Sequence, residues 1–238
     1  MSRQKSKRFA ESKLMPAIVE MEKENFLSMA GNWNSSFFKN TNPLVVELAC
    51  GKGEYSVGLG KAFPKKNFVG MDIKGARIYV GAKEAEEEGL SNVGFLRAKI
   101  ENLRTFFGWK EVDEIWITFP DPRPKDKDEK KRLTFSRFLK LYQHVLKHNA
   151  IIHLKTDNRP LMDYTVESIK SFGAEVLVLT HDLYESEWKD EHHGIQTYFE
   201  NKFTQKGFKI NYLKFRLPIL TEPEDEITPI FFRKEEVN

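Results

Sequence analysis

Short apolar runs alternate with amphipathic stretches along most of the chain after residue 42. The runs have the length of strands, and the stretches between them repeat apolar positions at helical spacing. The predicted strands are one that begins at Leu44 and includes Glu47, followed by 68–71, 93–98, 112–119, 150–155, 174–180 and 208–217. The predicted helices are 54–63, 75–88, 133–146, 161–172 and one that begins near Ile195. Strands that alternate with helices predict an α/β fold, with an open, mostly parallel sheet and helices on both faces.

The first 42 residues do not follow this alternation. Phe9, Leu14, Ile18 and Phe26 are spaced loosely for one helix face. We therefore expect residues 1–42 to form a basic, partly helical arm. From Pro43 onward no linker or internal repeat interrupts the pattern, so residues 43–238 are expected to form the domain.

Composition narrows the class of protein. With 238 residues, of which 40% are hydrophobic, the chain can bury a sizeable core and is unlike a disordered chain. No apolar run approaches the roughly 18 residues of a membrane span, and no apolar segment of a secretory signal follows Arg8. Cys50 is the single cysteine, which excludes an internal disulfide and a cysteine-rich zinc site. We expect a cytoplasmic protein that binds neither membrane nor metal.

The strongest chemical signal lies between residues 43 and 72. The first strand leads into Gly51 and Gly53, a helix follows, and the second strand stops at Asp72. This order is typical of a nucleotide-binding βαβ unit. The glycines would let the backbone approach a ligand closely, and Asp72 could accept hydrogen bonds from both ribose hydroxyls.

Two residues argue against a dinucleotide as that ligand. Ser56 stands where the third glycine of the G-x-G-x-x-G fingerprint belongs. Glu47 lies four residues before Gly51, where its carboxylate would repel a pyrophosphate. S-adenosylmethionine instead carries an ammonium and a sulfonium, which suit an acid. The alternative is a purely structural βαβ unit with an incidental acid.

Two further strand ends carry polar residues. Pro120, Pro122 and Pro124 make a stiff loop that holds Asp121, and Asp157 ends the fifth strand. Ligands of open α/β sheets bind at the carboxyl ends of strands, so these acids are expected beside the glycine turn. The alternatives are a proline-rich strand exit without chemistry and, for the neighbouring Lys155, either a lysine at the edge of the core or a substrate contact.

Charge suggests a polyanionic partner through its distribution more than through its sum, which is only +3. Basic residues gather in two places, namely Arg3, Lys5, Lys7 and Arg8 at the start, and Arg123, Lys125, Lys127, Lys130, Lys131 and Arg132 after the fourth strand. Such clusters are commonly solvated faces, but two of them beside a cofactor site favour a polyanionic partner.

Five segments together resemble one family. VELACGKGE, FPDPRPK, DEKKRLT, HLKTDNR and QTYFENKF are similar, in this order and at matching intervals, to segments of the bacterial tRNA (guanine-N7-)-methyltransferases. The resemblance covers roughly residues 32–217. It implies a Rossmann-like, seven-stranded sheet and methyl transfer from S-adenosylmethionine to N7 of a guanosine at nucleotide 46, in the variable loop of tRNA. Members are monomers or homodimers.

The resemblance also implies roles for individual residues. The implied cofactor-binding residues are Glu47, Gly51, Gly53, Asp72, Lys99, Ile100 and Asp121, of which Asp121 also lies at the catalytic centre. The implied substrate-binding residues are Lys125, Asp157, Thr197 and Glu200, and the implied RNA contacts are Lys127, Lys130, Lys131 and Arg132. Methylation at N7 removes no proton, so we expect orienting acids and no covalent nucleophile.

The chain departs from the family pattern at three places. Lys99, with Glu101 nearby, stands where an acid usually contacts the adenine, which leaves backbone contacts at Lys99 and Ile100. Tyr198-Phe199 replaces the usual Glu-Tyr, and Arg123 stands where many relatives carry Trp.

Two other functions remain open from the sequence. The segment 120–123 also resembles the acid-Pro-Pro-aromatic loop of methyltransferases that modify exocyclic amines, although Arg123 replaces the aromatic. A non-catalytic tRNA-binding protein is the second alternative. Cys50 is interpreted as a packing residue and the pair His192-His193 as part of a polar loop.

Overall fold

The computed structural model describes residues 8, 10–21 and 23–223. Arg3, Lys5, Lys7 and Phe9, on which some expectations rest, lie outside the described residues. The strands are β1 (Ile18–Val19), β2 (Leu44–Leu48), β3 (Asn67–Asp72), β4 (Val93–Arg97), β5 (Val112–Thr118), β6 (Leu146–Thr156), β7 (Glu175–Thr180) and β8 (Asn211–Arg216). The α-helices are α2 (Glu54–Ala62), α3 (Gly75–Glu87), α4 (Leu103–Phe106), α5 (Ser136–Val145), α6 (Arg159–Ser171) and α7 (Tyr198–Thr204).

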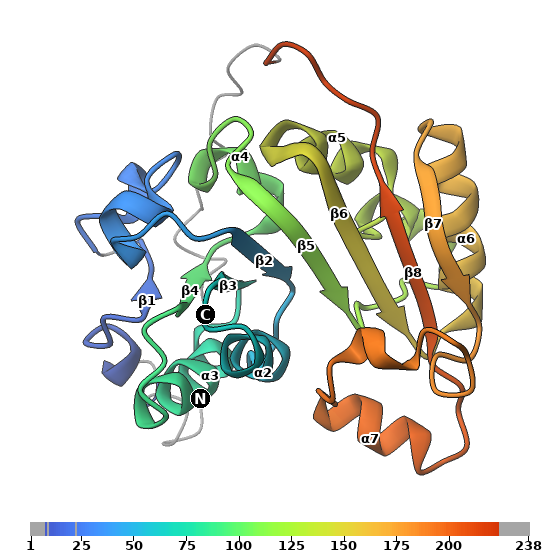
Figure 1. Ribbon diagram of the computed structural model, residues 1–238, viewed down its shortest axis with the longest axis horizontal. Coiled ribbons are helices and arrows are strands. Elements are labelled where there is room, and N and C mark those ends of the chain that lie inside the picture. The colour runs from blue at the N-terminus through green and yellow to red at the C-terminus, as the bar shows by residue number, and fades with distance from the viewer. Residues whose placement is uncertain (1–7, 9, 22, 224–238) are drawn as a thin grey trace.

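The described strands form one sheet in the order β1-β4-β3-β2-β5-β6-β8-β7 (Figure 1). Neighbouring strands are parallel from β1 to β6, and β8 is antiparallel to both β6 and β7. The predicted α/β class and mostly parallel sheet are confirmed. The strand number of seven is corrected to eight, because the two-residue strand β1 pairs with the outer edge of β4.

The strand order reverses between β2 and β5. β3 and β4 follow on one side of β2, while β5 and β6 follow on the other. Such a reversal is where an open α/β sheet leaves room for a ligand beyond the carboxyl ends of its strands. Leu48 pairs with Met71 and with Ile117, and Thr118 pairs with Lys155, so the ends of β2, β3, β5 and β6 lie along one rim.

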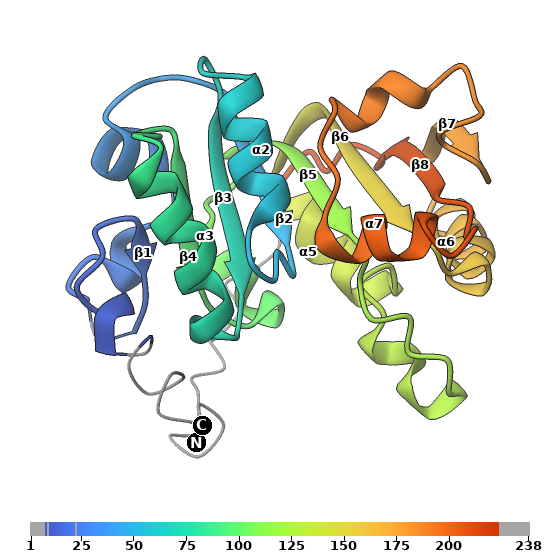
Figure 2. The same cartoon turned by 90° about the horizontal axis from the view of Figure 1, so that it is seen from below.

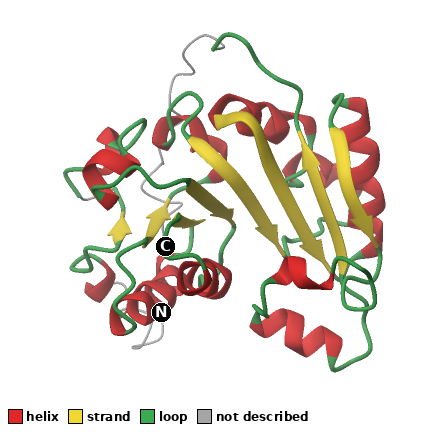
Figure 3. Ribbon diagram, viewed as in Figure 1, coloured by secondary structure: helices red, strands yellow, loops and turns green. Residues whose placement is uncertain are grey.

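Alternation of side chains builds a core on each face of the sheet. In β2, Val45 packs in the cluster that contains Tyr55 of α2 and Ile78 of α3. Its neighbours Leu44 and Val46 pack on the other face, in the cluster that holds apolar residues of α5 and α6. The helices therefore lie on both faces of the strand layer, as the sequence pattern predicts (Figure 3). No helix among the described residues is long and apolar enough to cross a membrane.

Residues 18–38 contribute to this core. After β1 come two short helical turns, η1 (Phe26–Ser28) and η2 (Trp33–Phe38). Trp33 is fully buried, stacks on Phe107 and donates a hydrogen bond from Nε1 to the carbonyl of Phe106 at 2.7 Å. This segment lies at the β1 edge of the molecule, opposite β7 and α6 (Figure 2). The boundary between arm and domain at residue 43 stays a prediction.

Candidate active site

The turn between β2 and α2 requires glycine for two different reasons. Ala49, Gly51 and Gly53 all have positive φ, of 57°, 59° and 73°. At Gly53 an added Cβ would also lie 2.4 Å from the ring of Phe95, whereas at Gly51 it would meet no protein atom within 4 Å. Gly51 is therefore required by its backbone conformation alone, and its Cα faces open space at the rim.

Asp72 joins the glycine turn to the end of β3. Its side chain is buried, with Oδ2 accepting from the backbone N–H of Gly51 at 3.0 Å and Oδ1 from that of Lys74 at 2.8 Å. The carboxylate is thus held in place by two backbone donors. Each oxygen can accept a further hydrogen bond, so the site still suits a diol.

Glu47 is buried under the turn and bonded on both oxygens. Oε2 accepts from the backbone N–H of Ser56 at 2.9 Å and from its hydroxyl at 2.6 Å, and Oε1 accepts from the hydroxyl of Thr118 at 2.7 Å. Burial raises the pKa of Glu47 to about 7, although these hydrogen bonds oppose the rise. An added cation would stabilise the ionised form.

Sequence reasoning missed Ser56 and Thr118 as partners of this acid. In the sequence Ser56 stands only as a missing glycine of the fingerprint, yet its N–H and its hydroxyl both donate to Glu47. The available signal was a hydroxyl residue in the first turn of α2, on the side that faces β2. Thr118 is the last residue of β5 and gave no signal of its own.

Lys99 and Ile100 follow β4 after one intervening residue, Ala98. The carbonyl of Asp72 accepts from the N–H of Ala98 at 3.2 Å, which sets this segment beside the end of β3. Lys99 precedes the turn η3 (Ile100–Asn102), and its carbonyl accepts from the N–H of Asn102 at 3.0 Å. The nearby Glu101 is exposed and ion-paired to Arg137 at 3.6 Å.

The loop after β5 holds Asp121 on the surface. Asp121 accepts a hydrogen bond from the backbone N–H of Arg123 at 3.2 Å, and its other oxygen lies 3.2 Å from Nε of the same residue. Phe119 and Arg123 have positive φ, which bends the loop on both sides of the acid. Arg123, which replaces the usual Trp, is thus an ion-pair partner of Asp121. The side chain of Asp121 remains 61% exposed and can meet a ligand.

The basic segment that follows splits into two groups. Lys127 and Lys130, in the turn η4 (Asp126–Lys131), are exposed, and so is Lys131, which pairs with Asp128 at 2.6 Å. Arg132 instead directs Nε and Nη2 to the carbonyl of Arg123 and stacks 4.2 Å over the ring of Tyr164. The segment, light green in Figure 2, extends away from the body of the molecule.

The end of β6 carries one half-buried acid and one buried cation. Asp157 is partly exposed, and burial raises the pKa of its carboxyl. The preceding Lys155 is fully buried, with Nζ 2.7 Å from Oε1 of Glu200. Lys155 is therefore part of the core and is not exposed to a ligand at the surface.

Thr197 and Glu200 form a capping box at the start of α7. The Thr197 hydroxyl accepts from the N–H of Glu200 at 3.2 Å, and Oε2 of Glu200 accepts from the N–H of Thr197 at 3.3 Å. The next N–H, of Tyr198, donates to Oε2 of Glu54 at 3.1 Å, and Nζ of Lys52 lies 5.3 Å from the Tyr198 ring. The start of α7 is therefore docked on the glycine turn. Lys125, by contrast, is exposed in the loop after β5.

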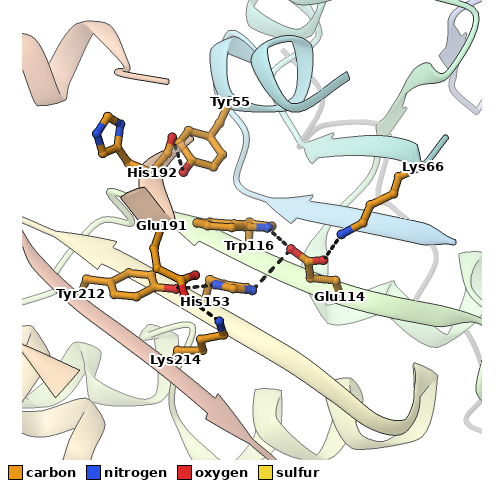
Figure 4. Close-up of polar contacts among 9 residues, drawn as sticks. All are labelled: Tyr55, Lys66, Glu114, Trp116, His153, Glu191, His192, Tyr212 and Lys214. Atoms are coloured by element: carbon orange, nitrogen blue, oxygen red, sulfur yellow. Dashed lines mark hydrogen bonds and ion pairs between the residues drawn. The ribbon is translucent and has the colours of Figure 1, made fainter. Parts of the chain in front are cut away.

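A network of buried and partly buried polar side chains crosses the sheet beneath this rim (Figure 4). Glu114 accepts from Nε1 of Trp116 at 2.5 Å and from Lys66 at 2.9 Å, and lies 3.3 Å from Nε2 of His153. Burial alone would raise the pKa of Glu114, but the hydrogen bond from His153 and the Lys66 ammonium lower it to about 2. The His153 ring stacks on Trp116 and its Nδ1 lies 2.8 Å from the hydroxyl of Tyr212.

The other end of the network holds the segment before α7. Glu191 accepts from the Tyr212 hydroxyl at 2.9 Å and from Lys214 at 2.8 Å, and the hydroxyl of Tyr55 donates to the carbonyl of His192 at 3.4 Å. These contacts fix the turn η5 (Lys189–His192) to the sheet, and with it the chain that leads into α7. Among the described residues, no group of three His, Cys, Asp or Glu side chains is arranged to hold a metal.

Comparisons with known proteins agree on one family. A family model described as "Putative methyltransferase" matches residues 41–213. The chain is 48% identical over 223 residues to a tRNA (guanine-N(7)-)-methyltransferase of Porphyromonas gingivalis, covering 92% of this chain and 91% of that protein. It is 45% identical over 221 residues to the protein of the same name from Christiangramia forsetii, covering 91% and 99%.

Solved structures with little sequence identity share the fold. The 16S rRNA methyltransferase KamB aligns with a TM-score of 0.61 at 14% identity, covering 85% of this chain and 99% of that one. A 16S rRNA (adenine(1408)-N(1))-methyltransferase from Catenulisporales acidiphilia, solved with its cosubstrate SAM, aligns with a TM-score of 0.53 at 13% identity, covering 83% and 93%. These neighbours confirm a methyltransferase fold.

Proposed function

The chain belongs to the tRNA (guanine-N(7)-)-methyltransferase family, and from that premise we propose that it transfers a methyl group from S-adenosylmethionine to N7 of a guanosine in tRNA. As the family resemblance implies, we propose nucleotide 46 of the variable loop as the target.

The observation that carries this proposal is the convergence of four acids on one rim. Glu47 lies in β2, Asp72 ends β3, Asp121 follows β5 and Asp157 follows β6. These four strands are consecutive neighbours across the sheet, and the order reverses in their middle. A cofactor with positive charge and a base with N–H donors would both find acceptors there.

The first two acids fit the methyl donor. Glu47 and Asp72 flank a glycine turn whose Gly51 faces open space, and a buried carboxylate with a raised pKa gains most from a cationic ligand. S-adenosylmethionine, when bound, supplies a methyl group on a sulfonium, which is already an activated electrophile. Asp72 would hold the ribose, and the backbone at Lys99 and Ile100 would lie against the adenine.

The other two acids fit the acceptor base. Guanine N7 carries a lone pair and no proton, so the reaction requires no general base from the protein. Asp121 and Asp157 would accept hydrogen bonds from N1–H and the 2-amino group, orient N7 and stabilise the positive charge that develops on the ring. Lys125 would add a cation beside the nucleotide. Contacts of Thr197 and Glu200 with the guanosine stay predictions from the resemblance.

The exposed lysines of η4 would bind the tRNA backbone. Lys127, Lys130 and Lys131 project from a segment that extends toward solvent, where ammonium groups can reach phosphates. We propose that Arg132 acts differently from these lysines, since its guanidinium supports the Asp121 loop through the carbonyl of Arg123.

Nucleoside analysis of reacted tRNA tests the proposal. Unmodified tRNA is incubated with the protein and labelled S-adenosylmethionine, digested to nucleosides and separated. We expect label in 7-methylguanosine. Label in a nucleoside methylated on an exocyclic amine would favour the alternative methyltransferase. Absence of product, together with tRNA binding and no S-adenosylmethionine binding in calorimetry, would indicate a non-catalytic tRNA-binding protein.

A further inference from the structure

A fully buried ion pair joins the end of β6 to the start of α7. The side chains of Lys155 and Glu200 are both 0% exposed, and Nζ lies 2.7 Å from Oε1. The ammonium also lies 4.9 Å from the centre of the Tyr55 ring, and apart from the ion pair Nζ has no hydrogen-bond partner among the described residues. Burying two charges costs desolvation free energy, which their mutual attraction offsets only when the two groups are paired.

The carboxylate of Glu200 is committed to the protein on both oxygens. Oε1 contacts Lys155 and accepts from the Tyr184 hydroxyl at 2.7 Å, while Oε2 accepts from the N–H of Thr197 at 3.3 Å. A side chain with no exposed surface and three internal partners is poorly placed to bind a nucleobase. The Glu200 side chain therefore links β6 to the start of α7.

The Lys155–Glu200 ion pair lies next to the contact between α7 and the glycine turn. Tyr198, the first residue of α7, donates its N–H to Glu54 and lies under the ammonium of Lys52. At the other end, Lys155 stands two residues before Asp157. The ion pair therefore connects the proposed cofactor side of the rim with the proposed guanosine side.

We propose that Lys155 and Glu200 are positioning residues, whose buried ion pair sets the start of α7 between the glycine turn and Asp157 and so aligns the guanosine with the methyl donor. This inference rests on the proposed function. It differs from the resemblance, which has Glu200 touch the substrate. In this proposal neither side chain contacts the base. Each is required because it neutralises the buried charge of the other.

A pair of exchanges and their combination separate positioning from contact. Lys155→Met removes the cation at similar length, and Glu200→Gln removes the charge while an amide can still complete the capping box. Each single variant leaves one buried charge unpaired, and the double variant leaves none. Lys83→Met combined with Glu87→Gln is the matched control, because this ion pair is exposed on α3.

The measurements are melting temperature, S-adenosylmethionine binding by calorimetry, and kcat and KM for tRNA well below the melting temperature. We expect each single variant to melt about 10 °C lower. Its kcat/KM for tRNA should fall roughly a hundredfold, as misplacement of a site by about 1 Å can cause. Binding of S-adenosylmethionine should change less. The double variant should recover most of both losses, and the control should change neither.

Two results would overturn the inference. If the double variant regains its melting temperature but stays as inactive as Glu200→Gln, the carboxylate itself binds substrate. If folded single variants keep the wild-type kcat and KM, the pair only stabilises the fold. Failure of the proposed function is a separate result, since the wild-type protein would then form no 7-methylguanosine.

Discussion

The two halves of the rim hold their acids in opposite ways. At the glycine turn, Glu47 and Asp72 are buried, and donors from the protein already engage their oxygens. After β5, Asp121 is mostly exposed, on a loop where its ion-pair partner, Arg123, is itself partly exposed. The first half is organised before any ligand arrives, whereas the second leaves its acid for the substrate. Substitutions in the first half should therefore affect folding and binding together, and those in the second should affect turnover alone.

The largest effect is expected from Asp121→Ala. Loss of an acid that orients the base and stabilises developing charge should lower the rate by about a hundred- to a thousandfold. Unfolding should be nearly unchanged, because exposed ion pairs contribute about 0–1 kcal/mol. Initial rates with labelled S-adenosylmethionine and unmodified tRNA, beside urea unfolding, check both. Asp126→Ala, also exposed and five residues on, is the control. A full rate in Asp121→Ala would mean that this acid has no part in the reaction.

The buried half should instead respond to pH. Folding raises the pKa of Glu47 from 4.5 to about 7, so the protonated form is the one that folding stabilises. Without ligand this contribution, about 3 kcal/mol, is full below pH 4.5 and is lost as pH rises to about 7. A cationic ligand requires the carboxylate, so affinity for S-adenosylmethionine should increase with pH, by about tenfold between pH 6 and 8.

Calorimetry at pH 6, 7 and 8 measures this dependence, with Glu47→Gln as the matched variant. The amide keeps the shape of the side chain and cannot ionise in this range, so its affinity should be lower at pH 8 and should lack the Glu47 contribution to the pH slope. If wild type and variant show the same slope, the titrating group is elsewhere, for instance on the ligand.

A smaller effect is expected from the exposed lysines beyond Asp121. Lys127 and Lys130 have no ion-pair partner among the described residues, so their ammonium groups are available to phosphates. Each exchange to Ala should raise KM for tRNA and reduce the slope of log affinity against log salt by about one unit, with kcat unchanged. Lys83→Ala, on α3, is the control. An unchanged salt slope would remove this segment from the RNA interface.

Much of the fold followed from local pattern, and the exceptions have physical causes. Helix α3 ends at Glu87, within one residue of the predicted range 75–88, and Gly89, with φ of 66°, follows its end. β6 begins at Leu146, four residues before the predicted start at Ala150. Residues 147–149 are exposed and polar, so their sequence predicts a loop, although the strand continues through them. β1 is two residues long, too short for any periodicity, and exists only because the edge of β4 is there to pair with.

The site divides in the same way. Acids at strand ends were predictable, since topology alone brings such ends to one rim. The partners of those acids were not, because they depend on packing between distant segments: Thr118 reaches Glu47 across 71 positions, and Lys155 meets Glu200 only once α7 folds back onto the glycine turn. Polar residues at alternate strand positions, such as Glu114 and His153, are typical of solvated faces, but here they belong to a largely buried network.

The smallest effect is expected from Cys50→Ala, although Cys50 lies within the glycine turn. Burial, first of all, and the nearby carboxylates Glu47 and Asp72 raise the pKa of the thiol well above its usual value, so it is no nucleophile at neutral pH. What the turn uses is the backbone of this residue: its N–H donates to Met71 at 3.1 Å and its carbonyl accepts from Gly53 at 2.8 Å. Alanine keeps both contacts, so the methylation rate should stay close to that of the wild type, and iodoacetamide should not inactivate the folded protein. Rapid inactivation by that reagent would show that Cys50 is a reactive thiolate. The glycine turn would then hold a nucleophile in addition to the carboxylates of Glu47 and Asp72.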